Sequence, residues 1–171
     1  MKIPALRTIS LILTMIFAGI TAGAQSVEDL RGKPAPAWSL KAPDGKTVNL
    51  TDFKGQIVLL DFWATWCGPC KLAMPSIQKV AKTYSGHKVV VIGINAWEED
   101  PKNAVAYMKA QKYDYKLVLG GDAVAANYHI EGIPTMIVIN DKGVVAEVHV
   151  GYDPNLQKTL SGSLDRLIAA R

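Results

Sequence analysis

The chain has 171 residues, of which 49% are hydrophobic and 20% charged, with a formal net charge of +4 at neutral pH. This length and apolar content fit a single domain that buries its own core, and no internal repeat or low-complexity tract points to a repeat or disordered protein. The basic residues are spread over several segments without interleaved aromatic residues, so nucleic acid is not an expected partner.

The first 24 residues have the pattern of a secretory signal peptide. Lys2 and Arg7 are followed by an apolar run over residues 9–20 and then by the small residues Ala22 and Ala24, which is the order found in such leaders. An apolar run this short falls below the roughly 20 residues needed to cross a bilayer, so an uncleaved membrane anchor is the less favoured alternative. We expect cleavage near Ala24, which would lower the formal net charge from +4 to +2 and release a soluble periplasmic or secreted protein.

A flexible lead-in and a β-hairpin are predicted to follow the leader. Residues 25–33 are polar, and Pro34 and Pro36 favour an extended backbone, so the folded domain is expected to span residues 34–171. Two short alternating segments, 38–40 and 47–50, flank the turn sequence PDGK at residues 43–46. This hairpin is expected to act as a lid over the edge of a sheet.

The only two cysteines lie three positions apart, between a predicted strand and a predicted helix. The run 57–63 is apolar apart from one aspartate, which is typical of a buried strand, and Gly68 and Pro69 mark the turn into a helix. Cys67 is therefore predicted at a helix N-terminus, where unpaired backbone N–H groups and the helix dipole stabilise a thiolate.

Cys67 and Cys70 are predicted to form a redox couple, because two sulfurs within one helical turn can alternate between a dithiol and a disulfide. We expect Cys67 to attack a substrate disulfide and Cys70 to resolve the mixed disulfide. A structural crosslink over so short a loop would stabilise the fold by only about 2 kcal/mol. A zinc site would need two more ligands, and His87, His129 and His149 are scattered without ligand-like spacing, so no metal or other cofactor is expected.

The remaining elements alternate in the order of an α/β protein with a mixed sheet. The β-branched run 89–92 predicts a central strand covered on both faces. Helices are predicted from residue 68 to about 84, from 101 to about 109, over 122–128 and from 154 onward, and further strands over 116–119, 136–139 and 144–150.

Asp61 stands out because a carboxylate inside an apolar strand is costly to bury unless it has a function or a partner. Burial would raise its pKa and would let it take a proton from Cys70 through a bridging water. The alternative is that Asp61 lies at the frayed end of the strand and is solvated.

The sequence DFWATWCGPCK at residues 61–71, together with Pro75 and the triplet IPT at 133–135, resembles that of thioredoxin-fold proteins. The wider layout has a leader, a hairpin before the first core strand and an inserted helical segment at about residues 98–127. This layout is similar to that of the exported thiol-disulfide oxidoreductases of the TlpA/ResA type. The resemblance implies a thioredoxin-like fold, in which helices sandwich a mixed β-sheet.

The resemblance also implies a substrate-binding surface around the dithiol. Pro134 is expected to be cis and to face the two cysteines, so that the backbone of Ile133 can pair with an extended substrate. Trp66, Gly68 and Pro69 are implied to belong to the surface against which a partner docks.

Two positions near the dithiol depart from the family pattern, and one neighbouring loop needs an interpretation. Thioredoxin has an acid at the position of Asp61 that takes up the proton, but its lysine partner is replaced near Gly93, and Ala73 stands where TlpA/ResA-type proteins often have a glutamate. Proton transfer to Asp61 would therefore work without those two helpers. We expect an ordinary loop, rather than a segment that determines partner choice, at Trp97, Glu98 and Glu99.

Together these features predict a monomeric, exported oxidoreductase that reduces disulfides of other exported proteins. The resemblance implies a membrane thiol reductase as electron donor and apocytochrome c as one client, and the Gly-Pro between the cysteines matches reducing thioredoxins. Two alternatives stay open: a thiol oxidase or isomerase using the same site, and a Cu(I) carrier, since two thiolates suit Cu(I). The related copper chaperones space their cysteines one residue further apart, and Ala64 replaces the Thr or Ser that peroxiredoxins carry.

Overall fold

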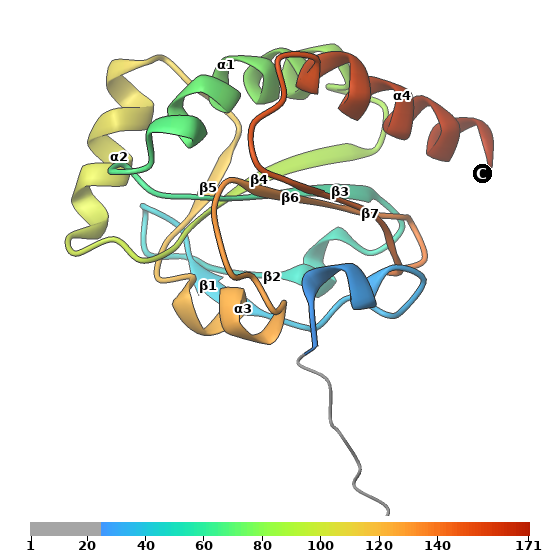
Figure 1. Ribbon diagram of the computed structural model, residues 1–171, viewed down its shortest axis with the longest axis horizontal. Helices are drawn as coiled ribbons and strands as arrows, with labels where there is room; N and C mark the ends of the chain where they lie inside the picture. The colour runs from blue at the N-terminus through green and yellow to red at the C-terminus, as the bar shows by residue number, and fades with distance from the viewer. Residues whose placement is uncertain (1–24) are drawn as a thin grey trace, which may run out of the picture.

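The computed structural model describes residues 25–171, so the predicted leader lies outside the described part of the chain. Within it, a five-stranded mixed sheet has the order β5-β4-β3-β6-β7 (Figure 1). The central strand β3 is parallel to β4 and antiparallel to β6, with β5 parallel to β4 and β7 antiparallel to β6. The strands are β3 (Ile57–Trp63), β4 (Val89–Asn95), β5 (Lys116–Val118), β6 (Thr135–Ile139) and β7 (Val145–Val150).

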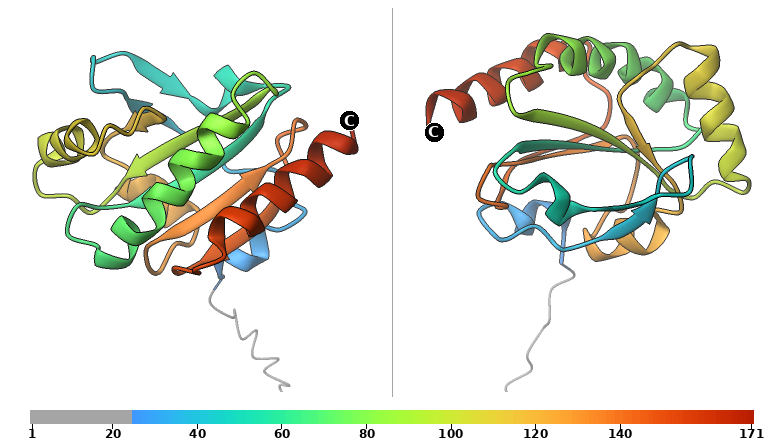
Figure 2. Two further views of the ribbon diagram at one scale, coloured as in Figure 1. Left: turned by 90° about the horizontal axis from the view of Figure 1, so that it is seen from above. Right: turned by 180° about the vertical axis from the view of Figure 1, so that it is seen from behind.

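Helices and a hairpin cover both faces of this sheet, which confirms the expected thioredoxin-like sandwich (Figures 1 and 2). One face carries α1 (Gly68–Thr83), α4 (Leu156–Ala169) and the apolar side of α2 (Pro101–Ala110). The other carries α3 (Asp122–Asn127), the hairpin β1 (Ser39–Lys41) and β2 (Thr47–Asn49), and two 3-10 turns, η1 (Val27–Leu30) and η2 (Leu50–Phe53). None of the helices found between residues 25 and 171 is long and apolar enough to span a membrane.

The alternation of side chains along β3 explains why the core has two halves. Ile57, Leu59 and Trp63 pack into the cluster under α1 and α4, whereas the even-numbered residues 58, 60 and 62 pack into the opposite cluster. Successive strand residues point to opposite faces, and all seven residues of β3 are buried. Asp61 is an odd-numbered position and therefore belongs to the α1 face.

The segment over residues 25–33, expected to be mobile, is folded against β7. Val27 and Leu30 of η1 are buried, and Gly32 donates its backbone N–H to the carbonyl of Val145 at 2.8 Å. The guanidinium of Arg31 donates to the carbonyl of Val148. This corrects the sequence-based expectation, because two apolar residues one turn apart are enough to cover an otherwise open patch of the sheet.

The hairpin lies over one face of the sheet rather than only along its edge. Trp38 and Leu40 pack in the same cluster as Phe62 of β3. The contact with the sheet edge is a single bridge past β5, in which Leu119 donates its N–H to the carbonyl of Lys41 at 2.9 Å. The predicted lid therefore serves mainly to bury apolar surface.

Candidate active site

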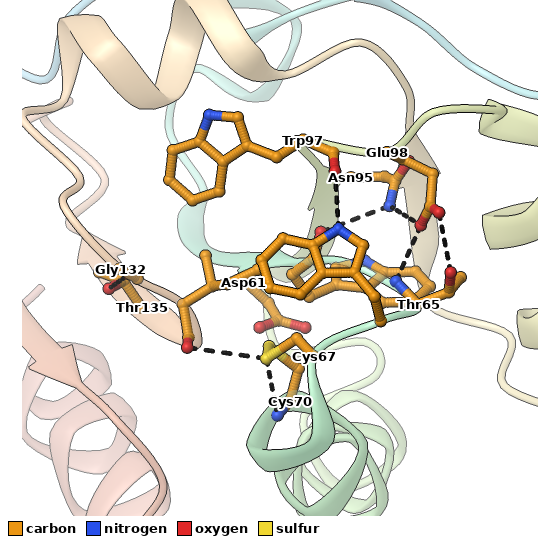
Figure 3. The surroundings of a disulfide bond; sticks show 12 residues. Asp61, Thr65, Cys67, Cys70, Asn95, Trp97, Glu98, Gly132 and Thr135 are labelled. Atoms are coloured by element: carbon orange, nitrogen blue, oxygen red, sulfur yellow. Dashed lines mark hydrogen bonds between the residues drawn. A yellow bond between two sulfur atoms is a disulfide. The ribbon is translucent and has the colours of Figure 1, made fainter.

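The disulfide between Cys67 and Cys70 lies where the chain passes from β3 into α1 (Figure 3). The two sulfurs are 2.03 Å apart and the two Cα atoms 5.3 Å apart. Cys67 is the N-cap of α1, and its Sγ accepts a hydrogen bond from the backbone N–H of Cys70 at 3.1 Å. Pro69 lies in the first turn, where a backbone N–H has no acceptor within the helix, so the missing N–H of proline costs nothing. The predicted position of Cys67 at a helix N-terminus is confirmed.

The disulfide lies just beneath an exposed rim. Cys67 is 4% exposed and Cys70 1%. Gly68 and Pro69 between them are exposed, and Trp66, directly before Cys67, is 61% exposed. The three residues that the resemblance placed around the dithiol therefore lie at the surface beside it.

The peptide bond between Ile133 and Pro134 is cis, as expected, and it lies against the disulfide. The carbonyl oxygen of Ile133 is 3.6 Å from Cys67 Sγ. In the disulfide no thiol hydrogen is present, so this is a contact rather than a hydrogen bond. The two segments meet because β3 and β6 are neighbours whose register pairs Phe62 with Thr135.

Asp61 is buried in the middle of the sheet and is 1% exposed. Its strand neighbours are Gly93 on β4 and Met136 on β6, so the alternative of a frayed, solvated strand end is wrong. Figure 3 shows the carboxylate pointing toward the cysteine pair. The sequence prediction of a buried acid near the dithiol is confirmed in its position.

Burial sets the protonation of Asp61. Desolvation raises the pKa of its carboxyl from the usual 3.8 to about 7, and a hydrogen bond from Tyr115 opposes that rise. The Tyr115 hydroxyl donates to Oδ2 at 3.4 Å, whereas Oδ1 has no hydrogen-bond partner among residues 25–171. Sequence reasoning missed Tyr115, which lies 54 residues away, because only the pairing of β4 with β5 brings it over the acid.

The two departures from the family pattern are both found in the immediate surroundings. Gly93 is the cross-strand neighbour of Asp61, and a Cβ there would lie 2.9 Å from Trp63 Nε1 and 3.1 Å from the ring of Tyr115. The Cβ of a lysine at this position would collide with the Trp63 ring and crowd the ring of Tyr115. Ala73 is fully buried in the same cluster as Cys70. Tyr115 is thus the polar side chain that contacts the acid in this protein.

The loop after β4 also contacts the active-site loop, which sequence reasoning did not foresee. Trp97 and Glu98 form hydrogen bonds with residues 65 and 66, just before Cys67 (Figure 3). The register pairs Trp63 with Asn95 as the last residues of β3 and β4. The carboxyl ends of parallel neighbouring strands lie at the same edge of a sheet. The predicted order of the strands was therefore enough to expect the loops after β3 and β4 to be neighbours.

The residues of the described region do not gather three metal-ligating side chains of the His, Cys, Asp or Glu type at one place. The functional groups that the structure brings together are the disulfide, the buried carboxyl of Asp61 and the backbone of Ile133.

Comparison with known proteins agrees with this geometry. Residues 30–164 match the family model described as Redoxin. The thiol-disulfide oxidoreductase ResA of Bacillus subtilis is 34% identical over 138 residues, which cover 80% of this chain and 75% of the relative. The sporulation thiol-disulfide oxidoreductase A of the same organism is 29% identical, covering 85% and 89%.

A solved structure supports the same assignment at the level of the fold. A thiol:disulfide interchange protein of the thioredoxin family from Chlorobium tepidum superposes with a TM-score of 0.71 and 29% identity, covering 81% of this chain and 97% of that one. The family match spans most of the chain and includes the cysteine pair and the cis proline. The chain therefore belongs to the Redoxin family and is a thiol-disulfide oxidoreductase of the TlpA/ResA type.

Proposed function

We propose that this protein is exported and reduces disulfide bonds in other exported proteins. The observation that carries the proposal is the disulfide at the start of α1, whose Cys67 sulfur faces both a helix N-terminus and the backbone of Ile133. The Gly-Pro dipeptide between the cysteines supports the reducing direction by resemblance to thioredoxins.

In the proposed cycle the Cys67 thiolate of the reduced protein attacks one sulfur of a substrate disulfide. A bond forms between those two sulfurs, the substrate S–S bond breaks, and the second substrate sulfur leaves as a thiolate that takes up a proton. Cys70 then attacks the Cys67 sulfur, re-forms the intramolecular disulfide and releases the substrate as a dithiol. Two electrons have passed to the substrate, so a donor dithiol must reduce the protein again. The proposed donor is a membrane thiol reductase.

The position of each sulfur supports this division of roles. The Sγ of Cys67 accepts a hydrogen bond from the backbone N–H of Cys70 at the positive end of a 16-residue helix. Cys67 also follows the exposed Trp66 directly in the chain. Anions are stabilised at such a terminus, which favours the attacking thiolate. Cys70 lies one turn further in and is covered, so it suits the intramolecular step.

Exposed apolar side chains around the disulfide support a protein as the substrate. In the described region the large hydrophobic side chains that remain exposed are Trp66, Leu72, Val150 and Tyr152. The first two flank the cysteine pair in sequence. Val150 pairs with Thr135, and Gly151 donates its N–H to the carbonyl of Pro134 at 2.8 Å, so the last two follow the strand beside the cis proline. Exposed apolar side chains next to the dithiol and next to the cis proline support a docking surface at this end of the sheet.

Asp61 is the proposed proton acceptor for Cys70. Because the pKa of its carboxyl is about 7, it can hold or release a proton near neutral pH. Its carboxylate faces the sulfurs from the interior, where bulk water does not reach. We propose that it takes the thiol proton of Cys70 as that sulfur attacks.

Export and the client belong to the proposal as well. The predicted leader over residues 1–24 supports a periplasmic or secreted location. Apocytochrome c is the proposed client, by resemblance to the TlpA/ResA type, and the protein is proposed to act as a monomer.

Trapping tests the assignment of the two cysteines. Cys70→Ala removes the resolving thiol, so mixed disulfides between Cys67 and exported proteins should accumulate and be visible as adducts on non-reducing gels. Cys67→Ala is the matched control and should trap far less. Adducts that form on Cys70 instead, or none with either variant, would contradict the proposed roles.

The direction of electron flow is tested by the reduction potential of the Cys67–Cys70 pair in a glutathione or dithiothreitol redox buffer. A reductase should lie near the thioredoxin value of about −270 mV, and a value near that of the oxidant DsbA, about −120 mV, would support the oxidase alternative instead. Insulin reduction by the reduced protein is expected. Stoichiometric Cu(I) binding without insulin reduction would favour the copper carrier.

The burial of Asp61 predicts an unusual dependence of stability on pH. Its pKa is raised in the folded protein, so the folded state binds more protons than the unfolded state between pH 4 and 7. Its contribution to stability is therefore present in acid and lost as the pH rises through 7. From pH 5 to pH 9 the free energy of unfolding of the oxidised wild type should fall by roughly 2 to 3 kcal/mol relative to Asp61→Asn.

Urea denaturation of both oxidised proteins at the two pH values measures this difference, and other titrating groups cancel in the comparison. A difference between wild type and Asp61→Asn that stays constant with pH would show that Asp61 is already ionised at pH 5.

A further inference from the structure

The loop that follows β4 is tied by its side chains to the loop that precedes Cys67 (Figure 3). Both carboxylate oxygens of Glu98 accept hydrogen bonds from Thr65: Oε2 from the backbone N–H and Oε1 from the hydroxyl, each at 2.8 Å. The Nδ2 of Asn95 donates to the same carboxylate at 3.4 Å and to the carbonyl of Trp63 at 3.3 Å. Glu98 thus closes a bridge between the ends of two neighbouring strands.

Trp97 holds the next residue along the active-site loop. The indole Nε1 of Trp66 donates to the carbonyl of Trp97 at 2.7 Å. Trp97 itself has a left-handed backbone with φ of 57°, and its N–H donates to Asp122 Oδ1 at 2.8 Å. A non-glycine residue in this conformation costs on the order of 1 kcal/mol, so hydrogen bonds on both sides are needed to keep it there.

The result is an exposed side chain with a fixed orientation. Trp66 is 61% exposed, yet the one polar atom of its ring is bound to the backbone of the loop after β4, and its neighbour Thr65 is held at two atoms. A large aromatic side chain that is already ordered loses little entropy when a partner packs against it. The hydrogen bonds made by Glu98 and by the carbonyl of Trp97 therefore order the exposed Trp66 side chain before a partner binds.

We propose that Glu98 is a positioning residue for protein substrates: together with the carbonyl of Trp97 it fixes Trp66 as a rigid apolar platform beside Cys67. The inference rests on the proposed reduction of disulfides in other proteins. Glu98 touches neither sulfur, so it acts through Thr65 and Trp66 on binding and leaves the exchange chemistry alone. Substrates that need no docking surface should not depend on it.

Two substrates separate docking from chemistry. With Glu98→Ala, the KM for insulin is expected to rise about two- to tenfold, the effect of having to order one large side chain at an interface. Its kcat should change less than about twofold, and its reaction with glutathione disulfide, which is too small to cover Trp66, should match that of the wild type.

Three further variants make the test specific. Glu99→Ala is the matched control, because Glu99 is exposed and forms no side-chain hydrogen bond with the described residues. Glu98→Gln should restore most of the wild-type KM, since an amide can accept from the backbone N–H of Thr65 and donate to its hydroxyl. Asp122→Ala removes the acceptor on the far side of Trp97 and should shift the KM for insulin in the same direction as Glu98→Ala.

Hydrogen exchange of the Trp66 indole N–H, followed by NMR and assigned with Trp66→Phe, reports on the platform directly. Exchange should be slow in the wild type despite the exposed ring and faster in Glu98→Ala. Unchanged exchange together with an unchanged KM in Glu98→Ala and Asp122→Ala would overturn the inference. An equal loss with both substrates would also overturn it, because Glu98 would then support the fold or the chemistry. If the wild type reduced glutathione disulfide but no protein disulfide, the proposed function itself would fail.

Discussion

The hydrogen bond from the backbone N–H of Cys70 to the Sγ of Cys67, at 3.1 Å, is the interaction on which the rest of the site depends. It places the sulfur at the positive end of α1, where an anion is stabilised by backbone groups that have no other partner. The buried strand β3 determines where this turn falls. A slip of β3 by one residue would move every side chain to the opposite face, including that of Asp61, so the apolar pattern of the strand also sets the position of the acid.

The two strands beside β3 complete the site from opposite sides. β6 brings Ile133 and the cis Pro134 against Cys67, and β4 brings Trp97 and Glu98 against the loop before it. The segment before β6 thus adds the backbone of Ile133 beside the sulfur, and the loop after β4 holds the proposed Trp66 platform. This arrangement explains how a change in the loop after β4 could alter partner choice while the dithiol keeps its geometry.

Much of this site could be predicted from the sequence because its signals are local. The spacing of Cys67 and Cys70, the apolar run before them and the Gly-Pro turn fixed the strand, the helix start and the buried acid, and the resemblance supplied the cis proline. Tyr115 and Glu98 were not foreseen, because each depends on which strands become neighbours and each lies in a segment without periodicity. The lead-in was misjudged because η1 has too few apolar residues to stand out, although β7 offers them a surface.

The most direct test of the account is the alkylation of the reduced protein by iodoacetamide at neutral pH, with each cysteine followed by mass spectrometry. A sulfur stabilised as a thiolate at the N-terminus of α1 should make Cys67 react before Cys70 and faster than free cysteine under the same conditions. Reaction of Cys70 first, or a Cys67 that reacts no faster than free cysteine, would contradict the claim that the start of the helix creates the nucleophile.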